Sequence, residues 1–174
     1  SHSTDIIATD YTTGVHFAGR GANRLTRIHV WGGPVKPPKP GDLPEMLKNS
    51  VCFRIDSCGE ILRDCYADTG AIGFWMNGWE IRMFGCSYFN NTGFNLKDIT
   101  VVRQDKGSLW VSGALFNRLT PDTKLYVGSP EAKIRWMDDC LLRFFDRNVD
   151  KTLPDTKGGT VPPVNIDVGR QLFL

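Results

Sequence analysis

Short runs in which apolar and polar residues alternate recur along the chain. They are Val15-His16-Phe17, Val51-Cys52-Phe53, Ile72-Gly73-Phe74 and Leu109-Trp110-Val111. Alternation with a period of two residues is typical of a β-strand with one buried face. Phe53 and Phe74 are 21 residues apart, and so are Leu62 and Met83. The pattern therefore predicts short strands that recur at this spacing and lie on top of one another.

A second repeated pattern has the form apolar-x-x-apolar-x-apolar. Its five copies are Leu25/Ile28/Val30, Leu62/Cys65/Ala67, Met83/Cys86/Tyr88, Leu96/Ile99/Val101 and Met137/Cys140/Leu142. It predicts a coiled stack of parallel strands, in which equivalent side chains form interior ladders about 4.8 Å apart. Leu96 follows Met83 too closely for this repeat, and Met137 follows Leu96 too late. Around Leu96, either the repeat loses its regular spacing or a strand of another sheet happens to have the same pattern.

Two segments interrupt the repeat and suggest how the chain is organised. Residues 34–44 contain five of the ten prolines, which excludes a central strand and predicts a loop inserted between two coils. The pattern fades after residue 148, so we expect residues 149–174 to form an extended tail that caps the stack or contacts another subunit. Residues 1–3 resemble the remnant of a tag. The predicted body is one domain over residues 4–148.

Composition and charge narrow the function classes. The 18 glycines, 10 prolines and 11% aromatic residues favour strands and turns over helices. A net charge of +2 leaves little basic excess to hold a phosphate backbone, so we expect no nucleic-acid partner. Nowhere do about 18 apolar residues run uninterrupted, so no membrane partner is expected either. The sequence Gly19-Arg20-Gly21 lacks the third glycine of a dinucleotide site, and we expect no cofactor.

The five cysteines are an odd number, so they cannot all pair within the chain. We interpret them as reduced thiols. A ladder of small core residues is the simplest role for them, with Cys65 lying over Cys86. A zinc site is not expected, because no two cysteines have the close spacing that such sites use.

Alternation also predicts which side chains point outward. On one sheet we expect the columns His16/Cys52/Trp110 and Ala18/Arg54/Trp75/Ser112, and on another His29/Tyr66/Ser87 and Trp31/Asp68/Phe89. Exposed aromatic residues are typical of ligand grooves or interfaces, and sugar C–H faces stack on aromatic rings. The candidate polysaccharide-binding residues are Trp31, Arg54, Tyr66, Trp75 and Trp110. For the three tryptophans, burial between subunits is an equal alternative.

Cleavage of a glycosidic bond needs two carboxyl groups, about 5 to 5.5 Å apart for retention or about 6.5 to 9.5 Å apart for inversion. Glu60 and Glu80 occupy similar turn positions, which predicts neighbouring places about 5 Å apart. Asp68 lies on the same coil as Glu60. These three are the candidate catalytic residues, and solvated turn charges are the alternative. A lyase would instead need a base and a cation, for which Arg54, Arg82 and Lys97 are available.

The segments Asn23–Val30 and Asn95–Val101 resemble the rungs of right-handed parallel β-helix proteins, a group that includes pectate-lyase-like enzymes and bacteriophage tailspikes. The resemblance covers residues 4–145 and includes no active-site motif. It implies an all-β fold, a right-handed parallel β-helix (solenoid) of about five rungs with an extended C-terminal tail. The cysteine usage, the insertion and the tail are closer to a tailspike than to a secreted pectinase.

The resemblance to tailspikes also implies a function. It implies a homotrimer in the virion tail that binds bacterial capsule or O-antigen polysaccharide during host attachment. Some tailspikes also cleave the polysaccharide, as a glycoside hydrolase or a polysaccharide lyase. Two other hypotheses remain open. One is a non-catalytic structural or trimerisation domain of a tail protein, and the other is a free-standing polysaccharide lyase or hydrolase.

Overall fold

The structure, a computed structural model, describes residues 2–4, 6–9, 12–19, 21, 23–31, 48–90, 96, 98–120, 122–137, 140–144, 150–152 and 166–167. For residues 2–4, 7–9, 143–144, 150–152 and 166–167 only the backbone is described. The proline-rich segment 34–44, Lys97 and most of the expected tail lie outside these residues. Within the described ranges, no helix has the length and apolar character needed to cross a bilayer.

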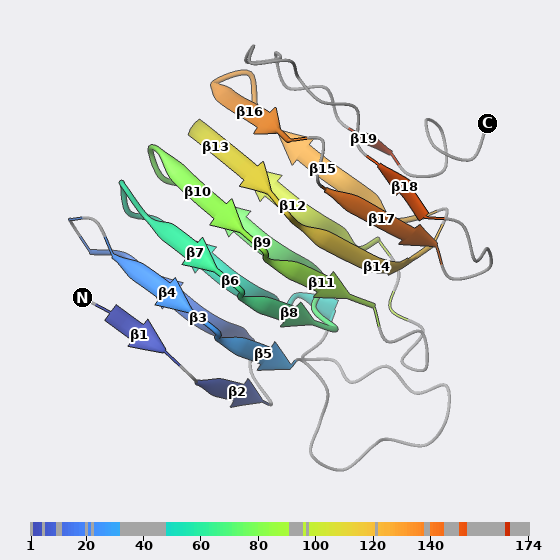
Figure 1. Ribbon diagram of the computed structural model, residues 1–174, viewed down its shortest axis with the longest axis horizontal. Helices are drawn as coiled ribbons and strands as arrows, with labels where there is room; N and C mark the ends of the chain where they lie inside the picture. Colours follow the sequence, from blue (N-terminus) through green and yellow to red (C-terminus); the bar gives the residue numbers. More distant parts are fainter. Residues whose placement is uncertain are drawn as a thin grey trace.

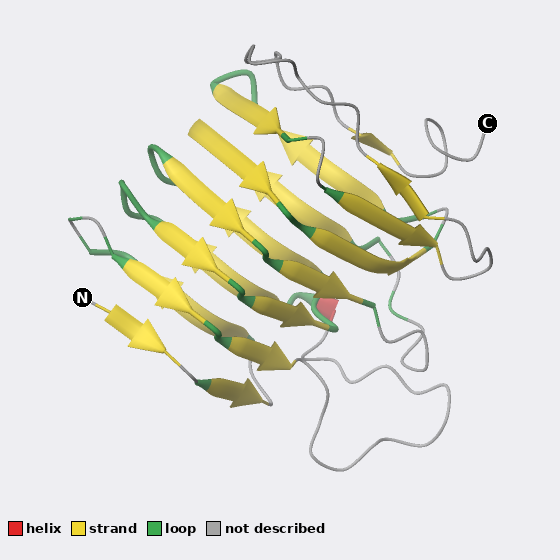
Figure 2. Cartoon of the chain, viewed as in Figure 1, coloured by secondary structure: helices red, strands yellow, loops and turns green. Residues whose placement is uncertain are grey.

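The described strands form three sheets, here named A, B and C (Figures 1 and 2). Sheet A contains β1 (His2–Thr4), β4 (Arg24–Thr26), β7 (Ile61–Arg63), β10 (Ile81–Phe84), β13 (Gly107–Ser112) and β16 (Ala132–Trp136). Sheet B contains β2 (Ile7–Thr9), β5 (His29–Trp31), β8 (Tyr66–Asp68), β11 (Ser87–Phe89), β14 (Leu115–Leu119), β17 (Leu141–Phe144) and β18 (Asp150–Thr152). Sheet C contains β3 (Thr13–Phe17), β6 (Val51–Ile55), β9 (Ile72–Met76), β12 (Thr100–Gln104), β15 (Lys124–Gly128) and β19 (Ile166–Asp167).

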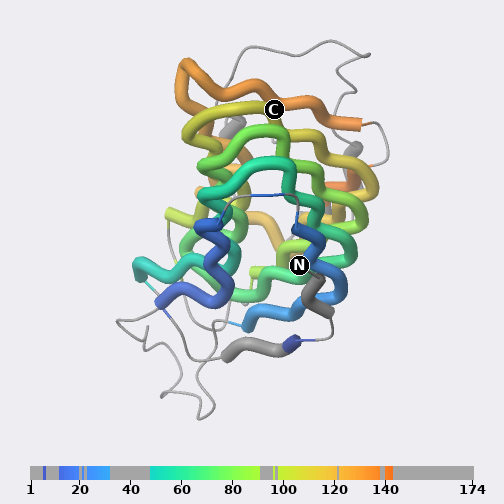
Figure 3. The backbone as a smooth tube through the Cα atoms, turned by 90° about the vertical axis from the view of Figure 1, so that its left-hand side faces the viewer, coloured from blue at the N-terminus to red at the C-terminus, as the bar shows by residue number. Residues whose placement is uncertain are grey.

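The chain visits sheets A, B and C in turn and then begins again, and each such passage is called a rung here. Strands of successive rungs pair in parallel within every sheet. Ala67 pairs with Tyr88 and Phe53 pairs with Phe74, both at the spacing that the sequence repeats predicted. Figure 3 shows the rungs stacked in chain order. The protein is therefore all-β, with three parallel sheets in an arrangement consistent with a parallel β-helix.

The corners that join the sheets differ in how much their length varies. Every described corner from sheet A to sheet B between β4 and β14 has two residues, and the first takes a left-handed backbone conformation. These first residues are Arg27, Asp64, Gly85 and Gly113, with φ between 51° and 63°. The amide of Asp64 donates to the carbonyl oxygen of Phe84 at 2.8 Å. This constant corner fixes the phase of sheet B relative to sheet A.

The corner from sheet B to sheet C varies instead. It spans residues 32–50 between β5 and β6, residues 69–71 between β8 and β9, and residues 90–99 between β11 and β12. The first of these includes positions 34–44, so the proline-rich segment falls between two strands of the same rung and not between two rungs. Leu96 and Ile99 belong to the third. The fourth copy of the apolar pattern is Val111/Ala114/Phe116, because Val111 pairs with Met83 and Phe116 pairs with Tyr88. The similar pattern at Leu96, Ile99 and Val101 therefore belongs to a different part of the rung.

The core consists of ladders that run through the rungs. Leu25, Leu62, Met83 and Val111 form one ladder on sheet A and are at most 1% exposed. The rings of Phe53 and Phe74 stack with centroids 5.1 Å apart. Cys65 and Cys86 are neighbours in the core, as predicted, and burial raises the pKa of the Cys86 thiol well above its usual value. All five cysteines are free thiols, and of these Cys58 is exposed.

The two ends of the chain add strands to this stack. Residues 2 and 3, which the sequence suggested to be part of a tag remnant, belong to β1 and pair in parallel with β4. In the expected tail, β18 pairs antiparallel with β17 and β19 pairs antiparallel with β15. Residues 149, 153–165 and 168–174 of the expected tail lie outside the described part of the chain.

Candidate ligand-binding site

The register corrects two of the predicted outward columns. Val15 pairs with Phe53, so His16 pairs with Arg54 and not with Cys52, which is fully buried. Strict alternation fails in sheet C because several of its strands contain two consecutive buried residues, such as Val101 and Val102. The observed outward column of sheet C is His16, Arg54, Trp75 and Arg103.

Trp110, which was expected on the same sheet, lies on β13 of sheet A. Its neighbours in the register are Arg82 on β10 and Arg135 on β16. Alternation by itself cannot assign a strand to a sheet, because Leu109-Trp110-Val111 has the same pattern as a strand of sheet C. The predicted groove is therefore divided between faces.

On sheet C, the indole ring of Trp75 lies between two guanidinium groups. The Cζ atoms of Arg54 and Arg103 are 4.6 Å and 4.4 Å from the ring centroid. Asp105 supports this stack from one side, because it accepts hydrogen bonds from Trp75 Nε1 at 2.6 Å and from Arg103 Nε at 3.0 Å. Both the ring and one guanidinium are thus bound to a carboxylate of the protein itself.

Asp56 supports the other end of the same stack. It accepts hydrogen bonds from Arg54 Nε at 2.9 Å and from Asn77 Nδ2 at 3.1 Å, and His16 Nε2 lies 2.7 Å from its Oδ2. Burial favours the neutral acid, but these three partners outweigh burial and lower the pKa of Asp56 below its ordinary value of 3.8. Both arginines of the stack therefore have a carboxylate partner.

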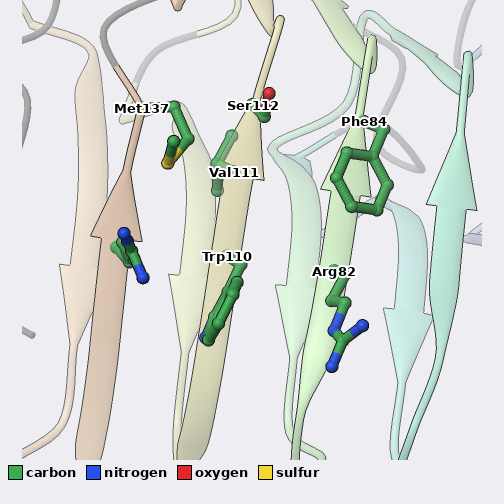
Figure 4. A pocket seen from close by; sticks show the side chains of 7 residues that line it. Arg82, Phe84, Trp110, Val111, Ser112 and Met137 are labelled. Carbon is green, nitrogen blue, oxygen red and sulfur yellow. The ribbon is translucent and has the colours of Figure 1, made fainter. Parts of the chain in front are cut away.

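Sheet A carries the same kind of stack, but no carboxylate of the described residues joins it. The Cζ atoms of Arg82 and Arg135 lie 5.4 Å and 5.0 Å from the ring centroid of Trp110, which is 42% exposed. The stack borders a groove of about 270 Å³ whose other lining residues are Phe84, Val111, Ser112 and Met137 (Figure 4). Within the described part of the chain, neither arginine has an ion pair, and Arg135 Nε is buried without a hydrogen-bond partner.

The outer face of sheet A is strongly basic. Its strands contain no acidic residue. The cationic side chains on this face are Arg24, Arg63, Arg82, Lys133 and Arg135. A net charge of only +2 for the whole chain is therefore unevenly distributed, and this face is a site of positive potential.

Sheet B has both of the predicted outward columns. His29 pairs with Tyr66 and Tyr66 with Ser87, while Trp31 pairs with Asp68 and Asp68 with Phe89. The rings of His29 and Tyr66 stack at 4.5 Å, and His29 Nε2 is 3.8 Å from Asp68 Oδ2. Burial raises the pKa of Asp68, even though it accepts a hydrogen bond from Thr69 Oγ1. Burial likewise raises the pKa of Tyr66 to about 12.

The two candidate catalytic glutamates lie at the corner between sheets C and A, but they do not form a pair. Glu60 precedes Ile61, which pairs with Arg82, so its register neighbour is the buried Ile81 and not Glu80. Its carboxylate is fully buried and accepts hydrogen bonds from Asn23 N at 2.7 Å and from Ser57 Oγ at 2.6 Å. Glu80 is exposed and has a left-handed backbone, with φ of 55°. Glu60 thus stabilises a corner, and the expected equivalence of the two positions is wrong by one residue.

The eight candidate residues are therefore divided among the three faces and a corner. Trp31, Tyr66 and Asp68 lie on sheet B, Arg54 and Trp75 on sheet C, and Trp110 on sheet A. Sequence reasoning did not identify Arg135, Arg103 and Asp105 as site residues. A signal was available for two of them, because Arg103-Gln104-Asp105 repeats the Arg-x-Asp spacing of Arg54-Ile55-Asp56, and residues two apart share a strand face.

Comparison with known proteins identifies no relative of this chain. No family model matches the sequence, and no curated protein or solved structure matches it significantly. The resemblance to tailspikes and pectate-lyase-like proteins consequently depends on the rung pattern alone. Function has to be argued from the side chains on the outer faces.

Proposed function

We propose that this chain is a closed, right-handed parallel β-helix belonging to a bacteriophage tailspike, and that it binds bacterial surface polysaccharide during host attachment. Two features support the architecture. The chain passes through three parallel sheets in a constant order, and parallel strands joined by crossovers almost always form a right-handed coil. In this proposal the protein acts in the virion tail, outside the bacterial cell.

The observation that carries the binding function is the groove on sheet A. Trp110 is exposed there, and the arginines beside it come from the preceding and following rungs (Figure 4). Successive rungs repeat about every 4.8 Å, so the face offers donors at regular intervals along a rigid surface. A polymer of repeating sugar units can use such an array, because its hydroxyl and acidic groups also recur at regular intervals.

A homotrimer is part of the proposal, and sheet C is the face best suited to contact between subunits. The arginines of its stack already have the carboxylates Asp56 and Asp105 as partners. Burying charges that are already paired and hydrogen-bonded costs less free energy than burying unpaired ones. Sheet A would thus stay free for ligand. Analytical ultracentrifugation tests this assignment, because Trp75→Ala should weaken the trimer and Trp110→Ala should not.

The experiment that tests binding compares two exposed tryptophans. Wild-type protein is passed over immobilised capsular and O-antigen polysaccharides from a panel of bacteria, and the retained polymers are identified. Trp110→Ala should weaken retention at least about tenfold, because the two arginines lose the ring that positions them. Trp79→Ala is the matched control, since Trp79 is 57% exposed at the corner between sheets C and A. Failure of the wild-type protein to retain any polysaccharide would refute this function.

Cleavage of the polysaccharide is a second candidate function, and the state of Asp68 favours it. Burial raises the pKa of Asp68 above its ordinary value, which favours the protonated form that a general acid needs. It lies beside His29 and Tyr66 on the outer face of sheet B. If this site cleaves, Asp68→Asn should abolish the release of reducing ends or of unsaturated products, while retention on sheet A is unchanged. Equal product release by both proteins would exclude Asp68.

A further inference from the structure

In the stack on sheet A a guanidinium group lies over the indole ring of Trp110 from each neighbouring strand, although the residue is 42% exposed. Arg82 is contributed by the strand on one side of Trp110 and Arg135 by the strand on the other. Their guanidinium carbons lie 5.4 Å and 5.0 Å from the ring centroid, over the ring. Stacking of a sugar on an aromatic residue needs an open ring face. The groups that this site offers to a ligand are therefore mainly guanidinium donors.

These donors lack an anionic partner among the residues that the structure describes. Neither Arg82 nor Arg135 forms an ion pair there, and Arg135 Nε is buried without a hydrogen-bond acceptor. A buried donor without an acceptor is costly, and a charged one is more so. On sheet C the same need is met by Asp56 and Asp105. Among the described residues, sheet A thus lacks the carboxylates that neutralise the arginines of sheet C.

We propose that the groove of sheet A binds the carboxylate groups of an acidic polysaccharide, an inference that depends on the polysaccharide-binding function proposed above. Each guanidinium of Arg82 and Arg135 receives one carboxylate through paired N–H···O bonds, the geometry that arginine favours. Trp110 keeps the two guanidinium groups apart. Because β10 and β16 are separated by one strand, the two carboxylates bound are about 10 Å apart.

Single-stranded nucleic acid is the other polyanion that such a face could attract, and the geometry disfavours it. Proteins hold single strands by stacking bases on open aromatic rings beside a positive groove. At Trp110 the arginines occupy the places over the ring that bases would need. The positive face also belongs to a chain with a net charge of only +2.

The test uses each polysaccharide that the wild-type protein retains from the panel, together with the same polymer after chemical reduction of its carboxyl groups to alcohols. We expect the retained polymers to contain uronic or other sugar acids, and their reduced forms to bind at least about tenfold more weakly. Binding should also weaken as sodium chloride increases, because salt screens exposed charges. A single-stranded oligodeoxynucleotide of equal charge is the third probe and should compete poorly.

Two variants locate the effect. Arg82→Gln and Arg135→Gln should each lower the affinity for the acidic polymer about tenfold or more, while affinity for the reduced polymer changes little. Lys106→Gln is the matched control, because it removes one positive charge from the corner between sheets C and A, outside both faces. Thermal unfolding of all three variants establishes that they remain folded.

The outcomes separate this inference from the function on which it depends. Failure to retain any polysaccharide overturns both. Retention of neutral polymers, or equal retention of acidic and reduced forms, overturns the acidic-ligand inference and leaves polysaccharide binding intact. An oligonucleotide that binds as tightly as the acidic polymer also overturns the inference. Loss of affinity on reduction, together with the arginine effects, supports it.

Discussion

Sheets A and C contain the same structural unit, a tryptophan between two arginines from neighbouring rungs, but in different chemical settings. On sheet C, Arg54 and Arg103 are each followed two residues later by an aspartate that binds the guanidinium. On sheet A, Arg82 and Arg135 are followed at that position by Phe84 and Met137. Residues two apart share a strand face, so an aspartate at this position can neutralise the arginine within the protein, whereas a phenylalanine or methionine cannot.

The strongest test of this comparison converts sheet A into a copy of sheet C. Met137→Asp places a carboxylate two residues after Arg135, at the spacing of Arg103 and Asp105. The new carboxylate should occupy Arg135 and repel an acidic polymer, so affinity should fall at least about tenfold. Met137→Asn is the neutral control of similar size. Binding is measured by retention on the immobilised acidic polysaccharide, and equal binding by both variants would contradict the comparison.

The second test asks which arginines contribute to stability. Asp105→Asn removes the charge that holds Arg103 and should lower the free energy of unfolding by about 1 kcal/mol. Arg135→Gln should change it by less than about 0.5 kcal/mol, because Arg135 has no ion pair within the described part of the chain. Chemical denaturation measures both values. A loss of stability in Arg135→Gln as large as in Asp105→Asn would remove the distinction between the two faces.

A smaller difference in stability is expected when each of the two tryptophans is replaced by phenylalanine. Trp75→Phe loses the hydrogen bond from the indole nitrogen to Asp105, whereas no hydrogen bond of Trp110 Nε1 is found among the described residues. Trp75→Phe and Trp110→Phe both reduce the size of the ring, so the hydrogen bond accounts for the difference in stability between the two variants. We expect Trp75→Phe to be the more destabilising by about 0.5 to 1 kcal/mol in denaturant unfolding. The opposite order would show that packing around Trp110 was underestimated.

The smallest expected effect concerns how the stability of two variants, compared with the wild-type protein, changes at acidic pH. The pKa of Asp56 is lowered in the folded protein, so its contribution to stability is fully present above pH 3.8 and is lost as the pH falls through the lower folded value. The stability difference between the wild-type protein and Asp56→Asn should therefore shrink below pH 3.8. For Arg82→Gln the difference should stay nearly constant, because the strands of sheet A contain no acidic residue. Unfolding measured at a series of pH values checks both.

Sheet B shows what could be predicted from the sequence, and the reason lies in the corners. The corner from sheet A to sheet B has two residues throughout β4 to β14, so one apolar pattern covers both sheets in constant phase. The outward positions of His29 and Tyr66, and of Trp31 and Asp68, followed directly from it. Their surroundings did not, because burial of Asp68 and its distance to His29 depend on how neighbouring rungs pack.

Sheets A and C show where such prediction fails. The corner from sheet B to sheet C is short at 69–71 and several times longer at 32–50, so a pattern in one rung cannot be aligned with the next by counting. His16 was consequently matched with Cys52 in place of Arg54, and Trp110 was assigned to the wrong sheet. Glu60 and Glu80 were aligned one residue out of register for a similar reason, since the corner before sheet A also changes length.

The order of residues along the chain is enough to predict short stacked strands and the interior ladders of the first three copies of the apolar pattern, because alternation and repeat spacing can be counted in the printed sequence. Which charges are neutralised depends on how the rungs align in three dimensions. Trp75 and Asp105, for example, lie on different rungs and meet because the register of those rungs brings them together. Loops of unequal length separate the rungs along the chain, and the pairing of backbone hydrogen bonds restores the alignment in space.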